Sequence, residues 1–484
     1  MSGLRKALLL TTAERYVGLL LNFGTLAVIS RILTPAEVGI AAIGWAILSI
    51  PYALRDLGTM DFLIQRPRLT PEETRAAATV GMLAAVVLVV AVEASAPAIA
   101  RLYGDPRIGD FLAVMALAVL TDAVANPLVG LMRRDLAFRD VAAVNVTLAV
   151  VTAVVTITLA ALGLGYMSVA WAGLAGNGAA AMMAVWLRPE PWVYRPRFRD
   201  WRLVAGFGSL YSLMAALMRA YEAMPYLALG RHGPADAMGH YSRALQTCQL
   251  PEKVVLSGIV SIAFPALAAE AREGRTLKRP YLAAIEIVTA VQWPALLLLA
   301  LLAPRVVAVL FGGQWTEIVP LVQIMALSSM FGAAGMLTYP ILYATGRLGQ
   351  VLLMMALSLP LSALVMLVAA GFGTTALAAS LFLTIPFNTY VALRFIKLHV
   401  GFSWAELGHA LKRSLATSAV AVAGPLAIVA AAGGGLDQPL AVQLLMAVTA
   451  LGGWFAGLAA TGHPLHAEIR RGRDAAMARL AARA

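Results

Sequence analysis

The chain has 484 residues, of which 61% are hydrophobic and 13% are charged, with a formal net charge of +12. Soluble domains average about 25% charged residues, so this composition cannot supply the solvated surface that several soluble domains would need. Runs of about 20 apolar residues match the hydrocarbon core of a bilayer, and they recur along the whole chain. The composition therefore excludes a soluble enzyme and a membrane anchor that carries a catalytic head.

Hydrophobic runs separated by charged, proline or glycine residues predict fourteen transmembrane helices and an all-α polytopic membrane protein. In chain order the predicted helices cover 10–32, 38–58, 76–100, 108–130, 141–162, 166–187, 203–229, 237–266, 281–303, 317–343, 348–370, 375–397, 412–431 and 439–460.

The 37 Lys and Arg residues alternate between the two sides of these predicted helices. With the N-terminus in the cytoplasm, 29 of them fall in cytoplasmic segments and 5 in external loops, as the positive-inside rule requires. The other three, Arg219, Arg243 and Lys253, lie within predicted helices. The basic excess thus indicates topology, with both termini cytoplasmic, and does not indicate nucleic-acid binding.

An internal duplication relates two halves of the chain. Residues 163–170 recur at 371–378, and residues 102–104 recur at 310–312, both at an offset of 208; the turn at 35–39 has a counterpart at 234–239. Each copy holds six helices, an even number, which predicts two parallel repeats around a central cavity. This arrangement favours a transporter over a scaffold or a channel. The predicted domains are an N-terminal six-helix half (1–187), a cytoplasmic linker (188–202), a C-terminal six-helix half (203–400), two additional helices (401–462) and a basic cytoplasmic tail (463–484).

Four motifs follow one another in the N-terminal half: LTPAEVG at 33–39, DLG at 56–58 with FLIQ at 62–65, LMRRDLAFR at 131–139, and ALGLG at 161–165. In order and spacing they resemble motifs of the polysaccharide and O-antigen flippases, within the multidrug/oligosaccharidyl-lipid/polysaccharide exporter superfamily, and most closely its colanic-acid-exporter-like subgroup. Val38 and Met238 depart from the pattern, because an aromatic residue is usual there.

The resemblance implies a flippase that moves a polyprenyl-pyrophosphate-linked oligosaccharide across the bacterial inner membrane by alternating access, for the synthesis of lipopolysaccharide, capsule or exopolysaccharide. Its expected partners are the lipid-linked oligosaccharide, membrane lipids, and a polysaccharide polymerase and glycosyltransferases.

Such a substrate needs cations inside a water-filled cavity, because an unpaired pyrophosphate cannot cross an apolar core. Arg219, Arg243 and Lys253 are the first candidates for substrate binding. In the alternative interpretation, Arg219 pairs with Glu222 three residues along the helix, and Lys253 pairs with the neighbouring Glu252.

Three further residues complete the predicted substrate site. Asn22 lies on a polar stripe of the first helix with Arg15, and Arg55 lies near the cytoplasmic face. There Arg15 and Arg55 would capture the pyrophosphate as it enters, or would only place their charged ends in water.

Glu222 and Asp122 are candidates for coupling to an H⁺ or Na⁺ gradient, since a buried carboxylate gains a proton easily. Asp122 could instead bond the backbone near the Asn126-Pro127 break. The sequence has no P-loop, metal-ligand cluster or nucleophile motif, so we expect neither an enzyme nor a cofactor. His463 and His466 are expected to be solvated in the C-terminal tail.

Two alternative functions remain. A drug/cation antiporter of the same superfamily usually has twelve spans, two fewer than predicted here. A polytopic polysaccharide polymerase or ligase generally needs a large external loop, whereas no predicted external loop exceeds about 16 residues.

Overall fold

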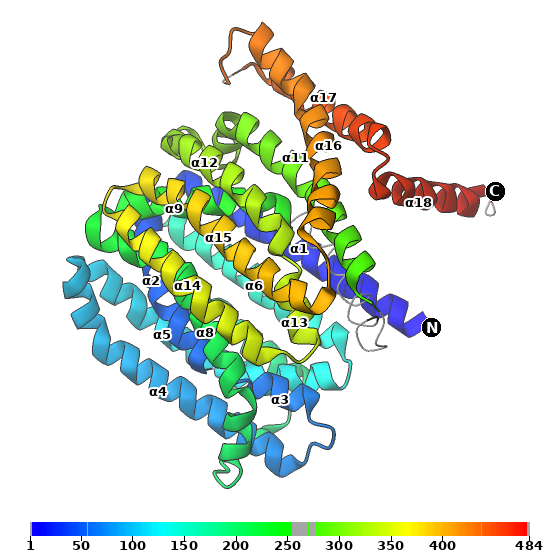
Figure 1. The fold of residues 1–484 in the computed structure, drawn as a ribbon. Helices are drawn as coiled ribbons and strands as arrows, with labels where there is room; N and C mark the ends of the chain where they lie inside the picture. The colour runs from blue at the N-terminus through cyan, green and yellow to red at the C-terminus, as the bar shows by residue number, and fades with distance from the viewer. Residues whose placement is uncertain (1, 56, 254–269, 271–275, 437, 482–484) are drawn as a thin grey trace. The chain divides into compact units, whose positions relative to one another are not determined.

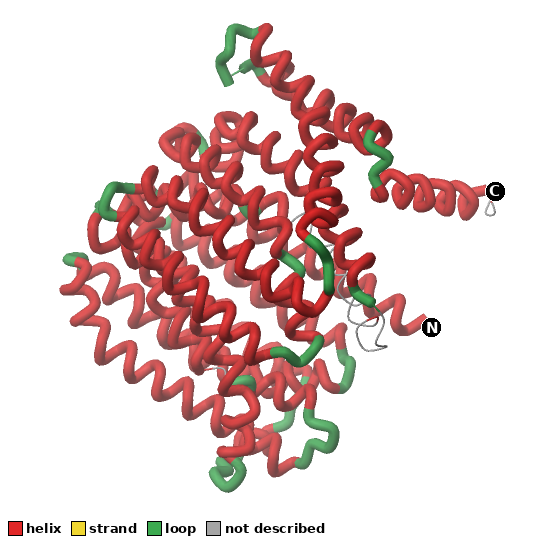
Figure 2. The backbone as a smooth tube through the Cα atoms, viewed as in Figure 1, coloured by secondary structure: helices red, strands yellow, loops and turns green. Residues whose placement is uncertain are grey.

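A computed structural model describes residues 2–55, 57–253, 270, 276–436 and 438–481. Helices joined by short turns make up these residues, and no strand occurs among them (Figure 2). Figure 1 follows their course along the chain. The α-helices are α1 (Ser2–Ile32), α2 (Pro35–Arg55), α3 (Thr59–Gln65), α4 (Pro71–Tyr103), α5 (Pro106–Arg134), α6 (Phe138–Ala161), α7 (Met167–Leu187), α8 (Trp201–His232), α9 (Ala235–Cys248), α11 (Lys278–Phe311), α12 (Val319–Ser329), α13 (Thr338–Ala344), α14 (Leu348–Ala370), α15 (Thr374–Val400), α16 (Trp404–Ala431), α17 (Leu440–Ala460) and α18 (Pro464–Ala481). Three 3-10 helices accompany them: η1 (Pro191–Tyr194), η3 (Gly313–Ile318) and η4 (Met330–Gly335).

The predicted fold class is confirmed: the chain is an all-α, multi-pass membrane protein. Within the described residues, 11 segments are long and apolar enough to cross a membrane, and Tyr16–Ile32 is a shorter apolar stretch. The predicted helix 317–343 is one apolar segment built from α12, η4 and α13. The predicted helix 237–266 begins in α9, and its part beyond residue 253 lies outside the described residues. The short helix α3 and the C-terminal helix α18 were not predicted, because neither is an apolar run of membrane length.

Local sequence sets where several helices begin. Thr70 and Ser403 precede α4 and α16, and each hydroxyl accepts a hydrogen bond from the backbone of a glutamate three residues later. Each glutamate returns a bond to the backbone N–H of its cap residue, which satisfies two donors that a helix start leaves open. These capping boxes define where two membrane-length helices begin.

The helices form two compact units, each described here by itself. Unit 1 contains residues 1–242, 310–314 and 370–374, and unit 2 contains residues 243–309, 315–369 and 375–484. In unit 1, α4 packs on α5 and α6 on α7 as helical hairpins, and α8 packs mainly on α2. In unit 2, α16 and α17 form a further hairpin. The division into six-helix halves at 188–202 remains a prediction.

The two turns that the duplication relates pack against each other inside unit 1. A Cβ added to Gly39 at the start of α2 would lie 1.8 Å from the carbonyl oxygen of Ala235. A Cβ added to Gly239 in α9 would lie 2.0 Å from the carbonyl oxygen of Pro35. Only glycine permits this reciprocal approach of two backbones, which explains why both copies of the turn end in glycine.

Candidate functional site

Among the ion pairs that the structure describes in unit 1, the most exposed lies near the middle of α8. Arg219 donates from Nη1 to Glu222 Oε2 at 2.6 Å, and the two side chains are 56% and 52% exposed. α8 contains the predicted transmembrane helix 203–229 but is not among the 11 apolar segments found in the described residues. A charge at the centre of a membrane helix costs about 2.5–3.5 kcal/mol in hydrocarbon, so charged groups in such helices face a bundle interior or water. The alternative pairing considered for Arg219 is therefore present, and both side chains are more than half exposed.

Earlier turns of α8, mostly on the stripe that leads to Arg219, hold the helix against α2 and α3. Val204, Ser212, Met214 and Ala216 are buried, and a Cβ on Gly208 would lie 1.9 Å from the carbonyl oxygen of Leu57. Because these turns are fixed by close backbone contact, the rotation of α8 about its axis is fixed as well. That rotation determines where Arg219 and Glu222 point.

A second charged cluster joins α2 to α5 and is buried. Arg55 Nη2 lies 2.6 Å from Asp122 Oδ2, and the Tyr52 hydroxyl donates to the same oxygen at 2.8 Å. The Arg55 guanidinium also lies over the Tyr52 ring, 4.7 Å from its centroid. The Arg55 side chain is only 3% exposed and that of Asp122 is 24% exposed. The structure thus brings together two residues that the sequence assigned to separate roles.

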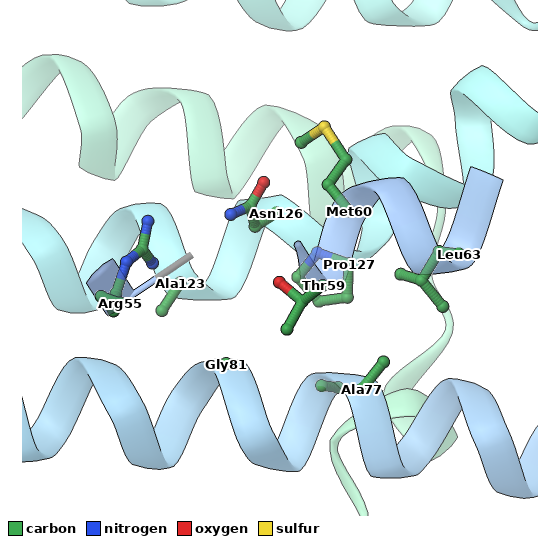
Figure 3. Close-up of a pocket in the computed structure, with 10 residues that line it drawn as sticks. Arg55, Thr59, Met60, Leu63, Ala77, Gly81, Ala123, Asn126 and Pro127 are labelled. Atoms are coloured by element: carbon green, nitrogen blue, oxygen red, sulfur yellow. The ribbon is translucent and has the colours of Figure 1, made fainter. Parts of the chain in front are cut away.

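A small cavity of about 10 Å³ borders this cluster, between α2, α3, α4 and α5. Figure 3 shows Arg55, Thr59 and Asn126 around it, with Gly81 of α4 on the facing helix. The Arg55 Nε is buried and has no hydrogen-bond acceptor among the described residues. A space of this size accommodates about one water molecule, so it is not a substrate site.

The remaining predicted site residues differ in their surroundings. Arg243, in unit 2, is 4% exposed, donates to Gln246 Oε1 at 2.8 Å and lies over the Trp315 ring at 5.7 Å. Lys253 is exposed at the end of the described segment. Asn22 is exposed, and its amide donates to the Gly18 carbonyl on its own helix at 3.1 Å. The Arg15 side chain lies outside the described part of the structure.

Sequence reasoning missed two structural partners of the motifs. Tyr52 binds both members of the Arg55–Asp122 pair, and its spacing of three residues from Arg55 on one helix was the available signal. Arg134 donates to the carbonyl oxygens of Leu63, Ile64, Arg66 and Pro67 at 2.7–3.4 Å. A guanidinium here satisfies the carbonyls that the end of α3 leaves unbonded. Two motifs that stand apart in the sequence therefore stabilise each other.

The expectation that His463 is solvated is wrong. It lies in the turn between α17 and α18, is 1% exposed, and its Nε2 lies 3.9 Å from Glu286 Oε1. The Ser414 hydroxyl lies 3.4 Å from the same nitrogen, and Arg413 lies 3.5 Å from Glu286. Burial, together with the charge of Arg413, lowers the pKa of His463 to about 4. Contacts with α11 and α16, which are distant in sequence, override the polar composition of the tail.

Comparison with known proteins identifies a family and relatives that match about two thirds of the chain or less. A family model described as "Polysaccharide biosynthesis protein" matches residues 28–320. The chain is similar to the lipopolysaccharide biosynthesis protein WzxC of Escherichia coli (strain K12), with 21% identity over 64% of this chain and 63% of that protein. It is also similar to the succinoglycan biosynthesis transport protein ExoT of Rhizobium meliloti (strain 1021), with 25% identity over 64% of this chain and 62% of that protein. Both alignments span less than two thirds of the relatives' length.

Two solved structures share the fold. The lipid II flippase MurJ in an inward closed conformation aligns with a TM-score of 0.74 at 10% identity, covering 93% of this chain and 97% of that one. An inward-facing multidrug resistance MATE family transporter of the MOP superfamily aligns with a TM-score of 0.62 at 15% identity, covering 82% and 96%. At these identities the likeness establishes the fold alone.

Proposed function

Because the chain belongs to the polysaccharide biosynthesis protein family, we propose that it is a flippase for a polyprenyl-pyrophosphate-linked oligosaccharide. It would move this lipid across the bacterial inner membrane by alternating access, with both termini in the cytoplasm. The glycan would then serve the synthesis of lipopolysaccharide, capsule or exopolysaccharide, beside a polymerase and glycosyltransferases. The proposal makes the chain a transporter and not an enzyme.

The observation that carries this proposal is the exposed Arg219–Glu222 pair near the middle of α8. More than half of each side chain is accessible, although a charge at this depth is costly in hydrocarbon. Water must therefore reach the pair, as it would in a transport cavity. A pyrophosphate competes well for a guanidinium, because phosphate oxygens form bidentate, charge-assisted hydrogen bonds with it.

We assign different roles to the other candidate residues. Lys253 is exposed and would offer positive charge to a pyrophosphate, whereas Arg243 is buried beside Trp315 and would do so only after it is uncovered. Arg15 and Asn22 would line it along α1. Arg55 is held by Asp122 in a buried pair, so it would reach a pyrophosphate only after that pair opens.

Energy would come from an ion gradient acting on a carboxylate. Release of Arg219 to the substrate leaves Glu222 without its partner, and an unpaired carboxylate binds H⁺ or Na⁺ more readily. Asp122 would act in the same way if Arg55 left it. In this proposal, the substrate binds Arg219 while the coupling ion binds Glu222, so both bind when one ion pair opens.

Complementation of a strain that lacks the gene tests the function. Arg219→Ala should abolish surface polysaccharide while the protein remains at wild-type abundance in the membrane. Arg231→Ala provides a matched control, because Arg231 is an exposed arginine at the end of the same helix. Full complementation by Arg219→Ala would rule out the proposed role of the pair.

The same strains separate the alternative functions. Accumulation of a complete lipid-linked repeat unit inside the cell is expected for a flippase defect. Loss of resistance to cationic drugs, with normal polysaccharide, would indicate an antiporter. Single repeat units at the cell surface without long chains would indicate a polymerase.

A further inference from the structure

The linker after η1 and the first turns of α4 enclose an apolar groove in unit 1. Its volume is about 300 Å³, and its lining residues are Ala78, Thr79, Met82, Leu83 and Val86 of α4 with Tyr194, Pro196 and Phe198 of the linker. This volume is at the lower end of the range for small-molecule sites. The groove is separate from the α8 pair and from the small cavity beside Arg55.

Specific hydrogen bonds hold the linker in place along this groove. The Arg75 Nε donates to the Arg195 carbonyl at 3.0 Å, and the Arg197 backbone N–H donates to the Thr79 hydroxyl at 2.9 Å. The Tyr194 hydroxyl donates to the Val124 carbonyl of α5 at 2.6 Å. The groove is therefore a built feature of the fold.

The lining suits an acyl chain and offers little to a sugar. The Tyr194 hydroxyl is already bonded to a carbonyl, and the Thr79 hydroxyl both accepts from Arg197 and donates to the Arg75 carbonyl. The other lining side chains carry no hydrogen-bonding group, and Leu83 and Phe198 are 53% and 62% exposed. A hydrocarbon chain would cover this surface without leaving a polar group unbonded.

Arginines adjoin the linker residues that line the groove. Arg195 and Arg199 are exposed, and neither forms an ion pair with any described residue. Arg75 lies four residues before Thr79 on α4, about 6 Å along the helix axis. An apolar groove next to accessible arginines matches a lipid that joins acyl chains to a negative headgroup.

The groove also lies at a depth in the membrane that the acyl chains of a phospholipid reach. α4 has 33 residues, about 50 Å, and so extends beyond a hydrocarbon core of about 30 Å. No charged residue occurs between Arg75 and Glu93, so hydrocarbon begins close to Arg75. The groove residues Thr79–Val86 therefore extend from about 6 Å to about 17 Å along the helix from Arg75, within the half of the hydrocarbon core that the acyl chains of one leaflet occupy.

We propose that this groove, with Arg195 and Arg199 at its rim, binds an anionic phospholipid. The acyl chain lies against Met82, Leu83, Val86 and Phe198, and the arginines contact the phosphate and the negative headgroup. The site does not depend on the substrate that is transported. It ties the linker between α7 and α8 to the lipid composition of the membrane.

Binding to the purified, delipidated full-length protein tests the charge at the rim. Native mass spectrometry should show tighter binding of phosphatidylglycerol than of phosphatidylethanolamine. One arginine at a membrane surface changes such binding about fivefold, so Arg195→Ala with Arg199→Ala should lower phosphatidylglycerol affinity about 25-fold. Arg133→Ala with Arg139→Ala removes two exposed arginines that do not adjoin any lining residue in sequence and should leave the affinity within about twofold of wild type. Equal binding of both lipids, or equal losses in the two double variants, would overturn the proposal.

A second pair of variants tests the groove itself. Val86→Trp fills the groove and should prevent binding, whereas Val87→Trp adds the same bulk to an exposed neighbour outside the lining. If a variant does not fold, photocrosslinking of wild type with a phosphatidylglycerol that carries a diazirine in its acyl chain provides the readout. Labelling of residues 82–86 or 198 supports the site. Labelling only at other residues would show that no phospholipid occupies the groove. Equal labelling of residues 82–86 or 198 by phosphatidylethanolamine, or displacement of the label by polyprenyl pyrophosphate alone, would show that the groove does not select an anionic phospholipid.

Discussion

Replacement of Asp122 by alanine tests how much the buried Arg55–Asp122 ion pair contributes to the stability of unit 1. It removes the acceptor of Arg55, whose side chain is 3% exposed, and the acceptor of the Tyr52 hydroxyl. Breaking a buried ion pair from one side costs about 3–5 kcal/mol, because the remaining charge stays desolvated. The Arg55 Nε has no acceptor among the described residues, so the stranded guanidinium has few alternatives. We expect a loss of about 4 kcal/mol for Asp122→Ala.

The double variant Arg55→Leu, Asp122→Leu shows how much of the stability loss comes from leaving Arg55 buried without a partner and how much from losing the attraction of the ion pair. It removes both charges and should recover more than half of the stability that the single variant loses, because an apolar pair is often as stable as a buried ion pair. Asp105→Ala is the control, since the more exposed Arg107–Asp105 pair at 2.7 Å is worth about 0–1 kcal/mol and the N-cap that Asp105 gives α5 is worth about 1 kcal/mol.

The assay is the apparent melting temperature in detergent at one fixed heating rate, because membrane-protein unfolding is often irreversible. Asp122→Ala should melt well below wild type, and the double variant and Asp105→Ala should melt close to it. Equal losses for Asp122→Ala and Asp105→Ala, or a larger loss in the double variant than in the single, would refute this reasoning.

Three further predictions concern contacts within the two units. Gly39→Ala should prevent stable folding, because its Cβ would lie 1.8 Å from the Ala235 carbonyl, whereas Gly18→Ala, with nothing within 4 Å, should melt like wild type. Arg134→Gln should destabilise the protein by about 3 kcal/mol through the loss of charged hydrogen bonds to the end of α3, and a melting temperature within 1–2 °C of wild type would contradict this. His463 has a folded pKa of about 4, below its unfolded value of about 6.5, so the unfolded chain binds more protons between these values and stability falls as pH drops from 6.5 to 4. His463→Asn should flatten that part of a melting-temperature profile against pH, and an unchanged slope would exclude His463 as its cause.

Much of the fold was predictable from the sequence, because the bilayer imposes a simple length rule. Apolar runs of about 20 residues mark helices directly, and the described parts of all the predicted runs coincide with helices. The helix α3 has 7 residues, and its carbonyl oxygens accept hydrogen bonds from the guanidinium of Arg134, a residue about 70 positions away. Such a helix has no local signal of its own.

The charged residues were harder to interpret from sequence alone. The Arg219–Glu222 pair follows from helical spacing, so its existence was open to prediction. The Arg55–Asp122 pair joins two helices that periodicity cannot place side by side. The burial of His463 depends on Glu286 and Ser414, which belong to two other helices. Local composition indicated a solvated tail, and tertiary contacts decided otherwise.

Reconstituted flipping tests the central claim most directly. The purified protein is placed in vesicles with a polyprenyl-pyrophosphate-linked oligosaccharide, and the appearance of the sugar on the opposite leaflet is followed with and without H⁺ and Na⁺ gradients. We expect movement that requires the protein, that slows about tenfold or more in Arg219→Ala through loss of a charged hydrogen bond, and that persists in Arg231→Ala. Movement no faster than in protein-free vesicles under either gradient, or equal rates for Arg219→Ala and wild type, would contradict the account.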